Sequence, residues 1–364
     1  MHNRTNVSML AVAITAALGF SATASAEVAV YGQIHTSVAR ISQDTCSDTV
    51  TTNCDYSATA IASHASRLGV KANKPMDNGL EAIGVAEFEY DTVDGVYSSS
   101  KSKDYPLDLD GDGVVDTTVT DTNSDKQIFK PRNMYVGLKG GFGEARIGHM
   151  DTPHKLATAN LDPFGDTYAD YNNIITVDNR LGNVVAYINK FGPVGVAAAY
   201  HAGDDSVTGE NNKSATSIMV NYDANGLYLA GAVESYGDTV AATNDLKSAS
   251  VVGAGYGFGP VKLGLAYERL AFDGTSKDDE SEIYASLQWK VTDSGTVKAA
   301  YGKRDDGVDA TDDAVMAALG YDHKMDKAMS VYALYANGTD GGLANKGKLK
   351  GDGSALALGV SYKF

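Results

Sequence analysis

One segment concentrates acidic side chains in a way that could act on charged solutes. Residues 151–178 hold five aspartates and two prolines, and they alternate apolar and polar residues far less regularly than the segments on either side. Carboxylates on one side of an opening and bases on the other set up a field that orients dipolar solutes and weights ion passage by charge. The aspartates are Asp151, Asp162, Asp166, Asp170 and Asp178, and the bases expected to face them from strands are Arg67, Lys71, Arg146 and Arg180.

Two of these aspartates have a second interpretation. Asp162 precedes Pro163 and Asp166 follows Gly165, which makes both good turn formers. A segment of this length without regular structure is uncommon inside a compact domain and usually carries function. The sequence therefore predicts a functional loop at 151–178 and leaves open whether these two side chains line an opening or shape the loop.

A second acidic motif has the spacing of a calcium loop. Acids stand at positions 1, 3, 5 and 9 of the motif and glycine at position 6, the arrangement that wraps oxygen ligands around Ca²⁺. Position 12, normally a bidentate glutamate, is Val119. We therefore expect an incomplete Ca²⁺ site or a solvated acidic loop, and no cofactor that the protein requires. The ligands would be Asp108, Asp110, Asp112, the carbonyl of Val114, and Asp116.

Both cysteines, Cys46 and Cys54, lie in one polar segment. Close cysteine pairs in exported chains commonly form a local disulfide, which we expect here. Two free thiols are the alternative.

No catalytic constellation emerges. There is no G-x-S-x-G elbow, P-loop, dinucleotide fingerprint or Cys/His metal cluster. We therefore expect no enzyme. The histidines are scattered, at His35, His64, His149, His154, His201 and His323 among other positions.

Residues 1–26 read as an export signal. Arg4 lies in a short polar start, an apolar run extends from Met9 to Phe20, and Ala24-Ser25-Ala26 is a small-residue cleavage site. The apolar run is shorter than the about 20 residues that a membrane-spanning helix needs. Removing Arg4 with the signal changes the formal net charge from −16 to −17, because residues 1–26 contain no acid and no other Lys or Arg. A surface this acidic repels nucleic acid.

The remaining residues, 27–364, predict one β-domain. In the last eleven positions, Leu356, Leu358 and Val360 alternate with small or polar residues. This pattern recurs about 16 times, and no later segment resembles a membrane-spanning helix. Short turns such as Asn78-Gly79 and Asn225-Gly226 alternate with longer polar loops, including an unusually long acidic loop at 91–130. Short turns at one rim and long loops at the other are typical of outer-membrane barrels.

The faces of these strands are inverted relative to a soluble barrel. The non-apolar face carries charges on many strands, among them Glu87, Glu89, Lys262 and Glu268. That many charges cannot be buried in a dry core. The interior must be wet and the apolar face must meet lipid, which predicts an all-β transmembrane antiparallel barrel of about 16 strands with a constriction loop folded into its lumen.

Several motifs resemble those of Gram-negative general porins. They are NMYVGLKGGFGEARIGHMD at 133–151, LDPFGDT at 161–167, DNRLGN at 178–183, AVYG at 29–32, SRLG at 66–69 and the terminal SYKF at 361–364. The resemblance covers essentially all of the mature chain. It implies a homotrimer of 16-stranded barrels in the outer membrane of a Gram-negative bacterium, each with a folded-in third loop.

We therefore expect a passive channel for ions and small hydrophilic solutes, with a mild preference for cations because acids outnumber bases. A solute-selective channel and a non-conducting structural or adhesion barrel are the alternatives. Besides membrane lipid, the basic run KGKLK at 346–350 is a candidate contact for anionic lipopolysaccharide.

Overall fold

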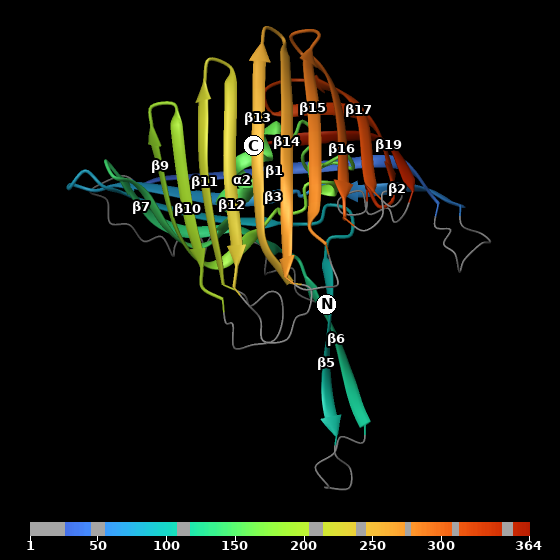
Figure 1. Ribbon diagram of the computed structural model, residues 1–364, viewed down its shortest axis with the longest axis horizontal. Helices are drawn as coiled ribbons and strands as arrows, with labels where there is room; N and C mark the ends of the chain where they lie inside the picture. The colour runs from blue at the N-terminus through green and yellow to red at the C-terminus, as the bar shows by residue number, and fades with distance from the viewer. Residues whose placement is uncertain are drawn as a thin grey trace, which may run out of the picture.

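The chain is almost entirely β-structure. The computed structural model describes residues 26–44, 55–107, 117–203, 214–237, 245–273, 278–307, 313–343 and 352–364 (Figure 1). The strands are β1 (Glu27–Asp44), β2 (Asp55–Ser63), β3 (Arg67–Pro75), β4 (Glu81–Glu89), β5 (Tyr97–Leu107), β6 (Thr117–Gln127), β7 (Lys130–Gly140), β8 (Gly143–Asp151), β9 (Arg180–Phe191), β10 (Val194–His201), β11 (Ala215–Ala224), β12 (Leu227–Tyr236), β13 (Asp245–Phe258), β14 (Val261–Asp273), β15 (Glu280–Lys290), β16 (Gly295–Asp305), β17 (Ala314–Lys324), β18 (Met329–Thr339) and β19 (Gly353–Lys363).

Antiparallel pairing closes these strands into a barrel. Seventeen of them form one sheet, in which β1 pairs with β19 on one side and with β2 and β3 on the other. Because β2 and β3 pair with successive parts of β1, they act as one strand interrupted at residues 64–66, where Ala65 has a φ of 49°. The barrel therefore has sixteen positions, which confirms the expected fold and strand number.

The two faces of the wall differ as the alternation predicts. Outward apolar side chains are widely exposed, for example Val136 at 66%, Ile147 at 61% and Leu358 at 60%. Fully buried inward side chains include the charged Glu234 and Glu268. Apolar residues outside and charged residues inside are the arrangement of a barrel whose solvent on the outer side is lipid.

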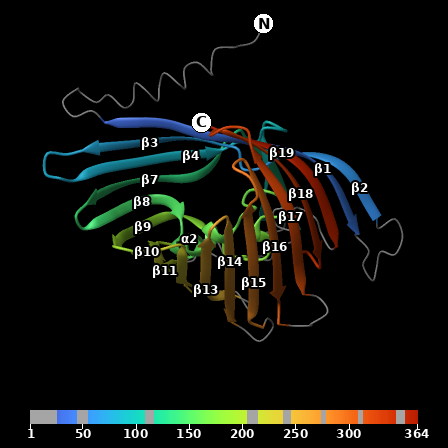
Figure 2. The same ribbon diagram turned by 90° about the horizontal axis from the view of Figure 1, so that it is seen from above.

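The two long loops differ in structure. The loop after β8 contains three short helices, namely α2 (Pro153–Thr158), η1 (Ala159–Leu161) and η2 (Tyr171–Asn173), and it lies inside the ring of strands (Figure 2). The loop after β4 contains the hairpin β5–β6, which extends away from the barrel at the bottom of Figure 1. None of the helices among the described residues is long and apolar enough to cross a membrane.

Candidate functional site

The loop between β8 and β9 is fixed to the inner wall by apolar contacts. Leu161, Phe164 and Ile174 are buried and belong to the largest apolar cluster among the described residues. Each lies where the wall has only a glycine: a Cβ added to Gly320 would be 2.8 Å from the Phe164 ring, and one added to Gly302 would be 2.7 Å from Ile174. The glycines against Leu161 are Gly253, Gly255 and Gly264.

Asp162 shapes the loop from inside. Its Oδ1 accepts hydrogen bonds from the Phe164 amide at 2.8 Å and the Tyr284 hydroxyl at 2.9 Å, and its Oδ2 accepts one from the Tyr171 amide at 3.1 Å. Burial raises the pKa of Asp162 to about 6, although the three hydrogen bonds oppose this shift. The turn-forming role is thus present in the structure, and Asp162 also lines a charged, open cavity.

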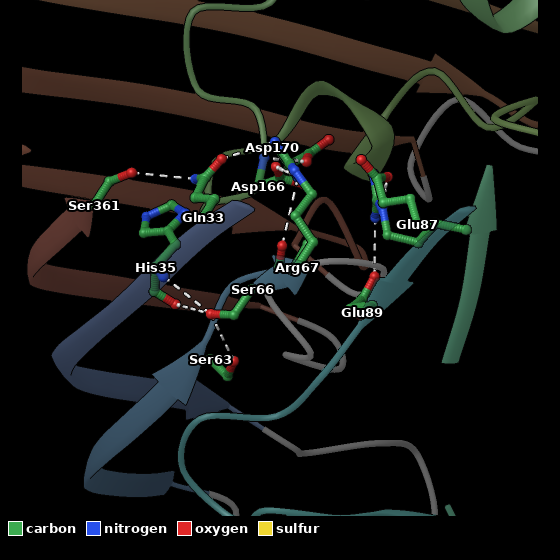
Figure 3. A network of polar contacts seen from close by, with 12 residues as sticks. Gln33, His35, Ser63, Ser66, Arg67, Glu87, Glu89, Asp166, Asp170 and Ser361 are labelled. Carbon is green, nitrogen blue, oxygen red and sulfur yellow. Dashed lines mark hydrogen bonds and ion pairs between the residues drawn. The ribbon is translucent and has the colours of Figure 1, made fainter. Parts of the chain in front are cut away.

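Asp166 and Asp170 form the tip of the loop (Figure 3). Asp166 has a φ of 58°, and its amide donates to Asp170 Oδ2 at 2.7 Å. Arg67 Nη1 on β3 is 2.9 Å from Asp166 Oδ2, and Arg67 Nη2 donates to Gln33 Oε1 at 2.8 Å. Burial alone would raise the pKa of Asp166, but the charge and hydrogen bond of Arg67 outweigh burial and lower it. Asp166 is therefore charged at neutral pH and paired with Arg67 on the wall.

A four-membered charge network holds the base of the loop. Lys155 Nζ on α2 lies 3.0 Å from Asp151 and 2.8 Å from Asp178, at the two ends of the loop. Arg180 Nη2 lies 2.9 Å from Asp151. The network joins the end of β8 to the start of β9, so Asp151, Asp178 and Arg180 are neighbours at the base rather than groups facing each other across the opening.

The other two predicted wall bases contact residues of the wall. Lys71 lies 5.9 Å from the centre of the Tyr31 ring. Arg146 pairs with Glu144 and lies 4.5 Å over the ring of Tyr135. Of the four predicted wall bases, Arg67 and Arg180 are the ones that the structure brings into contact with acids of the segment 151–178.

Arg132 is a wall base that the sequence did not reveal. Its Nε lies 2.6 Å from Glu87 and its Nη1 lies 2.9 Å from Glu89, and both acids are on β4 (Figure 3). The pairing of β4 with β7 shifts register between Ala86 and Phe88, which breaks the alternation that would have assigned Arg132 to the lumen. The adjacent Pro131 was the available signal of that irregularity.

Many of the charged groups of the loop and wall line an open cavity of about 670 Å³. Its lining is densely charged, with both signs present, and combines loop and wall. The charged residues that line it are Glu89, Asp91, Lys130, Arg132, Asp151, Lys155, Asp162, Asp166, Asp170, Asp178 and Arg180. Such a cavity is suited to hydrated, polar solutes rather than to an apolar ligand.

The predicted disulfide and calcium motif lie outside the described residues. This applies to Cys46 and Cys54 and to the segment 108–116. Within the described residues no group of three or more His, Cys, Asp or Glu side chains could hold a metal ion.

Comparisons with known proteins identify relatives. A family model described as Gram-negative porin matches residues 11–343. Outer membrane porin protein 32 of Delftia acidovorans is 25% identical over 348 residues, which cover 89% of this chain and 87% of that protein. Outer membrane protein U of Vibrio cholerae is 29% identical over 182 residues, 48% of this chain, and the chain thereby spans 49% of that relative's length. Among solved structures, a trimer form of OmpT, an outer membrane protein of Vibrio cholerae, matches with a TM-score of 0.62 at 19% identity. The match covers 93% of this chain and 100% of the OmpT chain.

Proposed function

Because the chain belongs to the Gram-negative porin family and is an outer-membrane protein, we propose that it is a passive diffusion channel for ions and small hydrophilic solutes. The observation that carries this proposal is the charged cavity of about 670 Å³ inside a closed barrel, narrowed by a docked loop. The solute gradient is the driving force, and the width and charge of the narrowed section determine which solutes pass. We expect no enzymatic activity.

The arrangement of charges supports a mild preference for cations. Asp166 and Asp170 supply acid at the loop tip, while Arg67 and Arg132 supply base on the wall beside Glu87 and Glu89. Each of these bases is already paired with an acid, so the additional carboxylates around the cavity leave the local charge negative. Negative charge along a water-filled passage raises the local concentration of cations.

Single-channel recording in planar lipid bilayers tests the proposal. Purified protein should insert and conduct, and a KCl gradient should give a reversal potential of the sign that indicates cation preference. A protein that inserts without conducting would be a structural or adhesion barrel. Saturation of the current by one solute and not by its analogues would identify a solute-selective channel instead.

We extend the proposal to assembly and surface partners. The solved relative in a trimer form supports a homotrimer, which would insert with conductance in three coupled steps. Membrane lipid would contact the apolar outer face, and lipopolysaccharide would contact the basic run at 346–350, which lies outside the described residues. Conductance in single, independent steps would contradict the trimer.

A further inference from the structure

A buried lysine on the wall contacts the turn of the constriction loop. Lys298 on β16 is buried, and its Nζ donates to the Pro163 carbonyl at 2.7 Å. The same Nζ lies 2.9 Å from Asp322 Oδ2 on β17 and 4.7 Å from the centre of the Phe164 ring. A buried ammonium group must be paired, and a carboxylate, a carbonyl and an aromatic face all stabilise such a group.

The wall beside Lys298 fits the same turn. Gly320 on β17 lies opposite Lys298 in the ladder, and a Cβ added to Gly320 would be 2.8 Å from the Phe164 ring. The ring therefore lies against the backbone of one strand and the ammonium group of the next. Because proline has no N–H group, the carbonyl of Pro163 is the backbone group of that residue that can bond to the wall, and Lys298 is its donor.

Hydrogen bonds within the turn connect this contact to the loop tip. Asp162 Oδ1 accepts from the Phe164 amide at 2.8 Å, and the Phe164 carbonyl accepts from the Thr167 amide at 3.1 Å and the Thr167 hydroxyl at 2.6 Å. Asp166, which has a φ of 58°, lies inside this closed turn. A shift of the turn at Pro163 is therefore transmitted to Asp166, three residues later.

The charges of Lys298 and Asp166 act on a passing ion in different ways. The Asp166 side chain is 27% exposed and lines the charged cavity, whereas the Lys298 side chain is 9% exposed and lies behind the turn. The positive charge of Lys298 is also neutralised by Asp322. An ion therefore meets Asp166 directly, and Lys298 affects that ion mainly through the position of Asp166.

We infer that Lys298 is a positioning residue for ion selection, which sets where Asp166 lies relative to Arg67. It does so by bonding the turn at the Pro163 carbonyl and the Phe164 ring. This inference rests on the proposed function, because it concerns which ions pass. Without the ammonium group the turn loses its bond to the wall, and Asp166 moves away from its place at the cavity. Cation preference then falls, although the group removed from the wall is positive.

Reversal potentials of a double-mutant cycle test the inference. Lys298→Met keeps the length of the side chain and removes its charge and its donors. Alone, it should lower the cation-to-anion permeability ratio by about twofold to fivefold, up to the effect of losing the charge of Asp166. In the Asp166→Asn background no acid is left to displace, so the ratio should stay unchanged or rise. Equal changes in the two backgrounds, including no change in either, would overturn the inference.

Three further variants separate position from charge and from folding. Lys298→Arg keeps the charge and the N–H donors, and its selectivity should lie closer to wild type than that of Lys298→Met. Lys262→Met removes the same charge from an exposed lysine on the inner face of β14, and it should raise cation preference equally in both backgrounds. If Lys298→Met does not fold, the cycle is measured with Lys298→Gln, which is one atom shorter than lysine and uncharged.

Hydrogen exchange in detergent tests the contact without requiring conduction. Lys298→Met should speed exchange of the Asp166 and Thr167 amides by about tenfold to a hundredfold, the effect of losing a hydrogen bond from a charged group. The Leu156 amide, which donates to the Thr152 carbonyl at the base of the loop, is the internal control and should be unaffected. Unchanged exchange at Asp166 and Thr167 in the folded variants would overturn the inference. A protein that does not conduct but shows this exchange pattern would refute the proposed function and leave the contact of Lys298 with the turn intact.

Discussion

Neutralising either member of the Arg67–Asp166 pair should change ion selectivity, in opposite directions for the two variants. Arg67→Gln removes a positive charge from the wall and leaves Asp166 ionised, so cation preference should rise. Asp166→Asn removes a negative charge from the loop tip and leaves Arg67 unpaired, so cation preference should fall. The two side chains are 2.9 Å apart and 23% and 27% exposed, so both reach water, and Asp166 lines the charged cavity.

The expected size follows from Coulomb's law. A unit charge about 4 Å from a passing ion changes the free energy of that ion by about 1 kcal/mol at the dielectric constant of water, or about fivefold in its relative permeability. Dissolved salt screens this interaction over about 10 Å at 0.1 M and about 3 Å at 1 M. The shift should therefore be large in dilute KCl and small in concentrated KCl.

Reversal potentials across a KCl gradient measure this effect directly. Arg67→Lys is the matched control, because it keeps the charge while losing the planar fork that contacts Gln33, and its selectivity should stay close to wild type. The double variant should return toward wild type. Shifts of the same sign in both single variants, or no shift in dilute salt, would refute the assignment of this pair to the constriction.

Three further predictions concern pH, packing and metal. Burial raises the pKa of Asp162 from 3.8 to about 6. The contribution of this shift to the free energy of loop docking is therefore full below about pH 4 and is lost as pH rises through about 6. Cation preference should rise between pH 5 and 7 in wild type and not in Asp162→Asn. Gly320→Ala places a Cβ 2.8 Å from the Phe164 ring and should lower stability by about 1–3 kcal/mol, measured by thermal unfolding, whereas Gly182→Ala, which meets no atom within 4 Å, should not. If the motif at 108–116 binds Ca²⁺, millimolar Ca²⁺ should raise the melting temperature relative to EDTA, and identical melting in both would contradict the site.

The barrel was predictable because its signal is repeated along the whole chain. Each strand alternates side chains across one wall, and outward residues such as Val136 and Leu358 are apolar while inward residues such as Glu268 are charged. A period of two residues survives small errors in strand limits, so the inversion of inside and outside could be inferred from many strands together.

Contacts between the loop and the wall were less predictable because they depend on register and on packing. The alternation places Glu268 on the inner face, but it does not indicate that Thr176 covers it and leaves it 0% exposed. Arg132 escaped notice because a register shift in β4–β7 interrupts the alternation at that point. The long acidic loop likewise gave no sign of the paired strands β5 and β6.

Residues on opposite sides of the loop determine the position of the constriction and its charge. On the wall side, Phe164 and Ile174 fill spaces opposite glycines, and burial of these side chains fixes where the loop lies. On the lumen side, Asp166 and Asp170 carry charge and contribute little apolar contact. Neutralising the part-exposed Asp166 should therefore alter selectivity with little effect on stability, whereas changing a glycine of the wall should move the loop and alter the width of the passage. Selectivity can thus diverge among related chains without any change in the barrel that holds the loop.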